Sequence, residues 1–131
     1  IQRCFALGRN VLIVDQRTSC ESEGKVISFG INEHRDCLSW IDFAVKTFGT
    51  DVKLVLTGIS MGASTVLMAA GKPLPKNVVG ILADCGFSSP KKIIQKCAKD
   101  QHYPAKLIYP FIKLGAKIYI LCTKTYSNTI Q

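Results

Sequence analysis

This sequence of 131 residues has few histidines and no cluster of cysteines or histidines with the spacing of metal ligands. Two histidines are present, His34 and His102, and the six cysteines form neither a C-x-x-C motif nor the spacing of a zinc site. We therefore expect no metal ion and no cofactor. The cysteines are predicted to be reduced core thiols of a cytoplasmic protein; they are Cys4, Cys20, Cys37, Cys85, Cys97 and Cys122.

Long apolar runs are also missing. Lys and Gly interrupt every candidate before the ~18 residues that a membrane-spanning helix needs, so no membrane anchor is predicted. The first eight residues contain neither an initiator Met nor the basic-then-apolar arrangement of a signal peptide. We expect the chain to begin inside a larger protein.

Acidic residues are almost absent from the last third of the chain. Residues 85–131 hold eight Lys and only Asp100, a net charge of +7, whereas residues 1–84 carry a net charge of +1. Such a segment could attract an anionic substrate, lipid headgroups or nucleic acid, although the spacing of its first lysines also fits one solvated helix face. Because the segment has no Arg and no interleaved aromatic and basic residues, no nucleic-acid binding is expected. Contact with a membrane surface has no further support in the sequence.

The remaining composition is that of a folded domain. Apolar residues make up 47% of the chain, which excludes disorder and favours a buried α/β interior in one domain at most. The order of the expected elements is β-α-β-α-β, which predicts a parallel sheet. Strands are expected at Val11–Asp15, Val52–Leu56 and Val78–Asp84, and helices before Gly8, from Asn32 to Gly49, after Ser60, and twice within residues 91–118 with a break near Tyr103 and Pro104. Residues 118–121 could add a strand, and residues 123–131 are expected to be unstructured.

The rest of the chain is organised around the stretch Leu54–Ala70, in which Gly58-x-Ser60-x-Gly62 joins an apolar run to a helix of small residues. A sharp strand-to-helix turn projects a serine above the carboxyl edge of a sheet, where a base can activate it. We expect Gly58 and Gly62 to be required because a side chain at either position would collide as the helix folds back over the strand. The N–H of Met61, at the helix start, is the candidate oxyanion donor.

The pattern G-x-S-x-G is short, and by itself it marks a turn more often than a nucleophile. The apolar strand before it and the helix after it favour the catalytic interpretation. Ser60 is therefore the candidate nucleophile.

Three stretches resemble the α/β-hydrolase superfamily, specifically the bacterial serine hydrolases with a Gly-x-Ser-Met-Gly elbow. The likeness spans roughly residues 5–115 and is carried by Val11–Arg17, Ser22–Gly30 and Gly58–Ala63. It implies part of a three-layer α/β/α parallel-sheet core over residues 1–85, the start of a helical cap over residues 86–118, placed above Ser60, and an ambiguous tail over residues 119–131. The chain departs from the family after Arg17, where Thr18-Ser19-Cys20 replaces the usual Gly-His-Gly.

In this family the triad acid and histidine follow the nucleophile on loops after later strands, and those strands are expected beyond this sequence. Within it, Asp84 is the one plausible acid and His102 a weak candidate for the base, with His34 weaker still. Arg17 is expected to hold its loop through an ion pair.

The resemblance implies a serine hydrolase, carboxylesterase or serine-aminopeptidase-like, that cleaves a small acyl substrate (an ester, thioester or amide) through an acyl-enzyme on Ser60. The alternative is a non-catalytic fragment or scaffold that keeps the elbow without the triad acid and histidine. In either case the 131-residue chain alone is expected to hydrolyse little.

Overall fold

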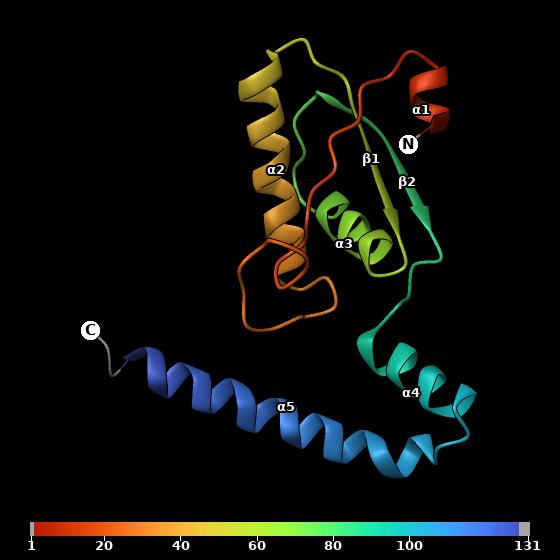
Figure 1. Ribbon diagram of the computed structural model, residues 1–131, viewed down its shortest axis with the longest axis vertical. Coiled ribbons are helices and arrows are strands. Elements are labelled where there is room, and N and C mark those ends of the chain that lie inside the picture. Colours follow the sequence, from red (N-terminus) through yellow and green to blue (C-terminus); the bar gives the residue numbers. More distant parts are fainter. Residues whose placement is uncertain (1, 129–131) are drawn as a thin grey trace. The chain divides into compact units, whose positions relative to one another are not determined.

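A computed structural model describes residues 2–128 and divides the chain into two units, Ile1–Gly86 (unit 1) and Phe87–Gln131 (unit 2). Unit 1 is mixed α/β with a small parallel sheet, and unit 2 is helical (Figure 1). The elements of unit 1 are α1 (Gln2–Ala6), α2 (Glu33–Phe48), β1 (Leu54–Ile59), α3 (Met61–Ala70) and β2 (Val78–Asp84), and those of unit 2 are α4 (Pro90–Asp100) and α5 (Ala105–Asn128).

The sheet consists of β1 and β2, which pair in parallel from Leu54 opposite Val78 to Ile59 opposite Asp84. Helix α3 packs against both strands, and α2 packs against α3 (Figure 1). Small and β-branched side chains allow this close approach, and they form the core of unit 1: Ile41, Ala44, Ala63, Val66 and Ala69. The predicted β-α-β unit around Ser60 is confirmed.

Asn77 fixes the start of both strands. Its buried side-chain amide donates hydrogen bonds to the carbonyl oxygens of Thr50 (2.7 Å) and Val52 (2.9 Å), and its carbonyl oxygen accepts from the Leu54 N–H at 2.7 Å. One side chain thereby satisfies backbone groups on the turn into β1 that would otherwise lack partners.

The predicted strand at Val11–Asp15 is wrong. The segment has no regular secondary structure, and Leu12 and Ile13 are 48% and 66% exposed. A β-branched run becomes a buried strand only when a neighbouring strand satisfies its backbone. Among the described residues of unit 1, β1 and β2 pair only with each other.

The described residues of unit 1 form two layers, not the expected three. Alternate β1 residues face α3, and the side chains that point the other way remain outside: Val55, Ile59 and, on β2, Leu82 are 40%, 67% and 59% exposed. The second face of the sheet is therefore apolar and uncovered by any described helix of unit 1.

Helix ends follow the predicted signals with one correction. Gly8 has φ +66°, and the hydrogen bonds from Gly8 N–H to Phe5 and from Arg9 N–H to Cys4 make a Schellman end for α1. Helix α2 ends at Gly49 as expected. Asn32 occupies the N-cap position of α2, but its side chain makes no capping hydrogen bond.

Unit 2 contains the two predicted helices and the break near Tyr103 and Pro104. Ser89 caps α4 by accepting a hydrogen bond from the Lys92 N–H at 3.2 Å. The predictions of a strand at residues 118–121 and of an unstructured segment from Thr123 are wrong up to Asn128, because α5 continues through them. Residues 129–131 lie outside the described residues. No helix in the described part of the chain is long and apolar enough to cross a membrane.

The cysteines differ from the expected core thiols. Cys4, Cys20, Cys37, Cys85 and Cys97 are all free, as predicted, but Cys20, Cys85 and Cys97 are exposed. Cys20 and Cys85 lie outside the helices and strands, with φ of +50° and +54°. Burial raises the pKa of the Cys37 thiol on α2. Cys122 lies outside the residues whose side chains are described.

Candidate functional site: the elbow between β1 and α3

Ser60 occupies the single-residue turn between β1 and α3. It is exposed, and its backbone has φ +53° and ψ −111°. A positive φ is uncommon for a residue with a Cβ atom, and such strain concentrates at functional sites. The turn presents the Ser60 side chain at the point where the strand ends and the helix begins.

Gly58 is the residue that permits this sharp turn. A Cβ atom at position 58 would collide with the carbonyl group of Gly62, so only glycine lets α3 pass so close to β1. The expectation for Gly62 itself is wrong, because a Cβ there would meet nothing within 4 Å. The close contact is therefore one-sided, because it excludes a Cβ atom at Gly58 and not at Gly62.

The elbow is tied to β2. The Ser60 N–H donates a hydrogen bond to the Asp84 carbonyl oxygen at 2.9 Å, and the Ser60 carbonyl accepts from the Ser64 N–H at 3.2 Å. The Met61 N–H is the first amide of α3 and has no acceptor within the helix by geometry. Ser60, Met61 and Asp84 are thus brought together at one end of the sheet.

The Asp84 side chain accepts a hydrogen bond from the Cys85 thiol at 3.1 Å. This hydrogen bond, together with the charge of Asp84, raises the pKa of Cys85. In this structure the Asp84 carboxylate is engaged by its neighbour in sequence.

The two histidines lie apart from these groups in the chain. His34 is in the first turn of α2, with Nδ1 3.1 Å from the Gly30 carbonyl oxygen. His102 belongs to unit 2, in the turn between α4 and α5, where it is exposed with φ +62°. A role for either as the base stays a prediction.

The loop before α2 is held by consecutive side chains. Gln16 donates to the Thr65 hydroxyl on α3 at 3.1 Å, and Thr65 donates in turn to the Met61 carbonyl at 2.9 Å. Arg17 binds both carboxylate oxygens of Asp36 on α2, each at 2.6 Å, which raises the pKa of Arg17. The expected ion-pair role of Arg17 is confirmed, and Gln16 links the same loop to the elbow helix.

Glu33 is the fully buried charged residue of this region, at 1% exposure. Its carboxylate accepts hydrogen bonds from the Ser28 N–H (2.8 Å), the Ser28 hydroxyl (2.7 Å) and the Gly30 N–H (2.8 Å). Burial acts to raise the pKa of Glu33, but these hydrogen bonds outweigh it, and the net pKa is lowered. These bonds tie the first residue of α2 to the loop that precedes the helix.

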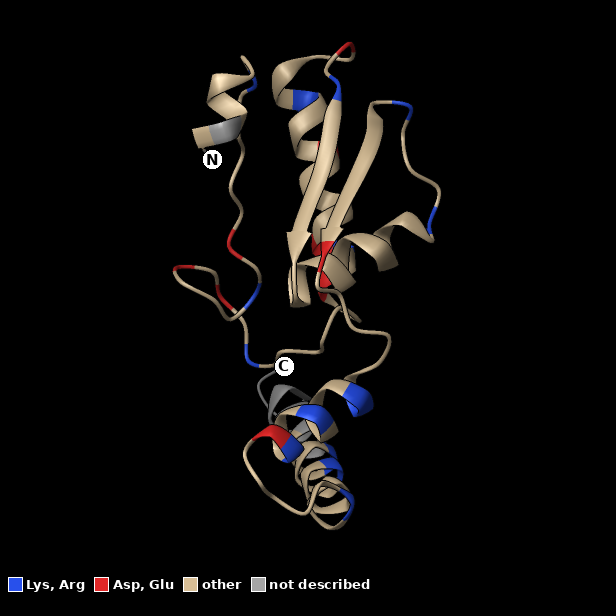
Figure 2. Ribbon diagram, turned by 90° about the vertical axis from the view of Figure 1, so that its right-hand side faces the viewer, with Lys and Arg blue, Asp and Glu red and all other residues tan. Residues whose placement is uncertain are grey.

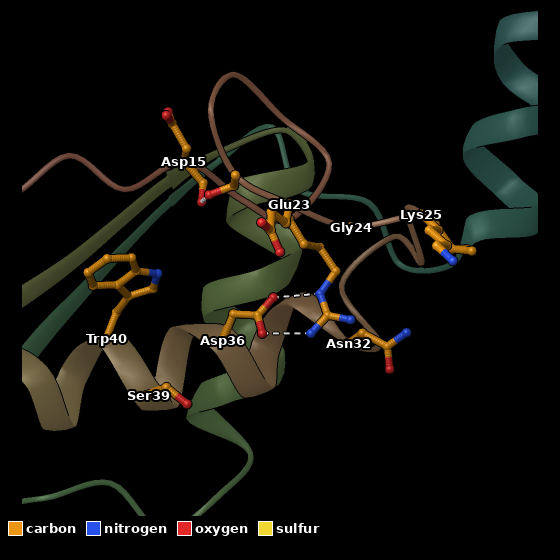
Figure 3. A pocket seen from close by; sticks show the side chains of 11 residues that line it. Asp15, Glu23, Gly24, Lys25, Asn32, Asp36, Ser39 and Trp40 are labelled. Carbon is orange, nitrogen blue, oxygen red and sulfur yellow. Dashed lines mark hydrogen bonds and ion pairs between the residues drawn. The ribbon is translucent and has the colours of Figure 1, made fainter. Parts of the chain in front are cut away.

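An open hollow of about 650 Å³ lies between this loop and α2, and Ser60 is not part of its lining. In Figure 3, Asp36 and the dashed lines of its ion pair with Arg17 lie between Trp40 and Asn32, with Asp15 and Glu23 above. Its walls combine carboxylates, a lysine, an asparagine and an indole. The residues are Asp15, Arg17, Ser22, Glu23, Gly24, Lys25, Val26, Asn32, Asp36, Ser39 and Trp40.

In the sequence, Glu33 and Asp36 are recognisable only as acidic residues suited to the positive end of a helix, and no pattern names their partners. The Glu33 contacts are local, since its carboxylate reaches back to N–H groups three and five residues before it. The Asp36 and Thr65 contacts join residues 19 and 49 positions apart, and no local pattern encodes them.

Comparison with known proteins gives one partial likeness. Over 82 residues, 63% of this chain, the sequence is 34% identical to "Uncharacterized protein YqkD" of Bacillus subtilis (strain 168). The matched part is 27% of that protein, so the chain corresponds to about a quarter of its length. No family model and no solved structure matches the chain.

Proposed function

We propose that the protein is a serine hydrolase of the α/β-hydrolase type that cleaves a small acyl substrate through an acyl-enzyme on Ser60. One observation carries the proposal: an exposed Ser60 with φ +53° at a single-residue turn between a parallel strand and a helix. A turn that served only to connect the elements would not require a strained serine against a glycine that tolerates no Cβ.

In the proposed reaction the Ser60 oxygen attacks the carbonyl carbon of the substrate while a base removes the hydroxyl proton. The negative charge that develops on the carbonyl oxygen is stabilised by the Met61 N–H at the positive end of α3. Collapse of the tetrahedral intermediate breaks the bond to the alcohol, thiol or amine, which leaves with a proton. Water then hydrolyses the acyl-enzyme by the same two steps.

The proposed reaction also requires a base for the Ser60 hydroxyl and an acid that orients the base. By the order typical of the resemblance, a histidine and an acid outside residues 1–131 complete the triad, and Asp84 then orders the end of β2. His102 and Asp84 are the candidates within the sequence. The free thiols accord with a reducing, cytoplasmic location.

The test uses the full translation product of the gene together with the 131-residue chain. Each is treated with a serine-reactive phosphonate, and the labelled peptide is mapped by mass spectrometry. We expect the full product to be labelled on Ser60 and to turn over a short-chain activated ester. Ser60→Ala should abolish the label and lower turnover by about 10⁶-fold. Ser39→Ala, an exposed serine on α2, is the matched control and should change neither.

A full product that resists labelling and shows no turnover would favour the non-catalytic scaffold. Turnover by the 131-residue chain within tenfold of the full product, lost in Ser60→Ala, would contradict a base outside the chain. His102→Ala and His34→Ala would then identify which histidine serves.

A further inference from the structure

Helix α5 carries a row of large apolar side chains that its own unit leaves uncovered. Leu107, Phe111, Leu114 and Ile118 are 66%, 69%, 56% and 52% exposed. Their spacings of four, three and four residues place them on one side of a helix, within an arc of about 60°. An apolar row of this length is unusual on a free surface and marks a site of contact.

A different side of α5 is occupied by α4. Ala105 is buried, Ile108 is half-buried, and the two helices pack along this side. The Lys91 ammonium of α4 lies 5.7 Å from the centre of the Tyr109 ring, a cation–π distance that fastens the pair. The contact with α4 therefore covers one face of α5, and the apolar row lies on another face.

A line of lysines lies on the side of α5 next to that of the apolar row. Lys106, Lys113 and Lys117 are exposed and follow one another at seven and four residues, which places them on a third side of α5, about 110° around the helix from the row. On α4, Lys92, Lys96 and Lys99 form a second line at four and three residues.

The two lines of lysines meet at a hollow. It has a volume of about 330 Å³ and is bordered by Lys92, Lys96, Lys99 and Lys106, with Asp100 the only acid in its lining. Residues 87–131 contain eight lysines, and Asp100 is their one acidic residue. Figure 2 shows the basic positions on both helices. Four lysines against one acid give this hollow an excess of positive charge, which favours an anion there.

We propose that unit 2 docks on an anionic lipid bilayer, with the apolar row of α5 in the boundary between headgroups and acyl chains and the lysines on the lipid phosphates. An interfacial helix combines a narrow apolar face with lysines on its polar side, and α5 has both. The hollow between α4 and α5 accepts one phosphate group of a headgroup. This inference is independent of the chemistry at Ser60.

Charge decides between this occupant and others. A second copy of unit 2 would bring the same net charge of +7 to the contact, and like charges oppose that association. Nucleic acid would satisfy the lysines but offers no apolar surface to the row of α5. An anionic bilayer satisfies both the lysines and the apolar row.

The experiment measures co-sedimentation of the full chain with vesicles of phosphatidylglycerol and phosphatidylcholine in equal parts, and with pure phosphatidylcholine vesicles. We expect binding to the anionic vesicles, little binding to the neutral ones, and weakening as salt rises from about 0.1 M to about 0.5 M. Equal binding to both vesicle types, or none to either, would overturn the proposal.

Two variants separate charge from apolar contact. The triple change Lys92→Gln, Lys96→Gln and Lys99→Gln should weaken anionic binding roughly a hundredfold. Its matched control, Lys46→Gln, Lys53→Gln and Lys72→Gln in unit 1, removes the same charge from exposed positions and should change binding less than about threefold. Leu107→Gln with Leu114→Gln keeps good helix formers and should also weaken binding, by at least about tenfold.

The other occupants have distinct signatures. If the apolar row packs against another part of this chain, the leucine variant lowers the urea midpoint and leaves vesicle binding unchanged. If it packs against a second copy, the variant converts a dimer to a monomer in size-exclusion chromatography. If the lysine triple in unit 2 and the control triple in unit 1 weakened vesicle binding equally, net charge alone would explain the binding. Each of these results contradicts the proposal.

A fluorescent variant tests the insertion directly, so that a misfolded variant cannot be mistaken for lost binding. Phe111→Trp places an indole in the apolar row, and its emission should shift to the blue and be quenched by brominated lipids in anionic vesicles only. Unchanged emission on vesicles that sediment the chain would mean that the row does not enter the bilayer.

Discussion

The Ser60 amide donates a hydrogen bond to the Asp84 carbonyl oxygen at 2.9 Å, although Ser60 lies one residue beyond the end of β1. In a parallel ladder this bond is part of the pairing of Ile59 with Asp84, the last pair of the sheet. The residue that follows each strand has a positive φ: +53° at Ser60 after β1 and +54° at Cys85 after β2. The position of the candidate nucleophile is thus fixed by β2 as well as by its own strand.

The two glycines of the elbow should respond oppositely to alanine. Gly58→Ala places a Cβ against the Gly62 carbonyl and should lower the free energy of unfolding by about 1–3 kcal/mol or more. Gly62→Ala meets open space within α3 and should be neutral or stabilising by up to about 1 kcal/mol. Urea denaturation of both variants measures this, and equal losses would contradict the one-sided contact.

Glu33 should make stability depend on pH. Its folded-state pKa is lowered, so its contribution is complete above the unfolded pKa of about 4.3 and is lost as pH falls through the lower folded value. Glu33→Gln should lower the free energy of unfolding by about 1–3 kcal/mol at pH 7, because an amide cannot accept all three hydrogen bonds. The difference from the parent chain should shrink below about pH 4.

The exposed Glu21→Gln is the control for this measurement and should shift the urea midpoint little at any pH. A loss from Glu33→Gln that is the same at pH 7 and pH 3.5 would indicate a packing effect in place of the carboxylate's hydrogen bonds.

Asp84 should restrain the reactivity of Cys85. Because the hydrogen bond and charge of Asp84 raise the thiol pKa, less thiolate is present near pH 8 than for an ordinary exposed cysteine. Asp84→Asn should speed alkylation of Cys85 by iodoacetamide several-fold, measured by peptide mass spectrometry. The exposed Cys97 is the internal reference, and its rate should not change. An equal increase at both thiols would contradict a direct effect.

The bare face of the sheet should promote aggregation of the isolated chain. Val55 and Leu82 are 40% and 59% exposed on this face. The double change Val55→Thr and Leu82→Thr replaces this apolar surface with β-branched side chains that still suit a strand. Light scattering on warming should decrease, with little change in the urea midpoint. Ile41→Thr, at a position 3% exposed in the core, should instead destabilise the chain and increase scattering. If the double variant aggregates as fast as the parent, another surface is responsible.

Local chemistry was sufficient for most elements. The end of α2 followed from Gly49, the turn at Ser60 from the apolar run, glycine and small residues around it, and the break between α4 and α5 from Pro104. Each signal acts within a few residues and needs no distant partner. The strand at Val11–Asp15 failed because a strand, unlike a helix, requires hydrogen bonds from another part of the chain.

The sequence by itself determined helices α1 to α4, the start of α5 and strand β2, and that Ser60 stands between a strand and a helix. Tertiary structure decided that Gly58 is essential where Gly62 is not, that Glu33 is buried as a loop-organising carboxylate, and that Asp36 and Thr65 receive Arg17 and Gln16. The physical reason is range. Propensity and capping act over one helical turn, whereas steric contact, burial and side-chain hydrogen bonds depend on residues that only folding brings together.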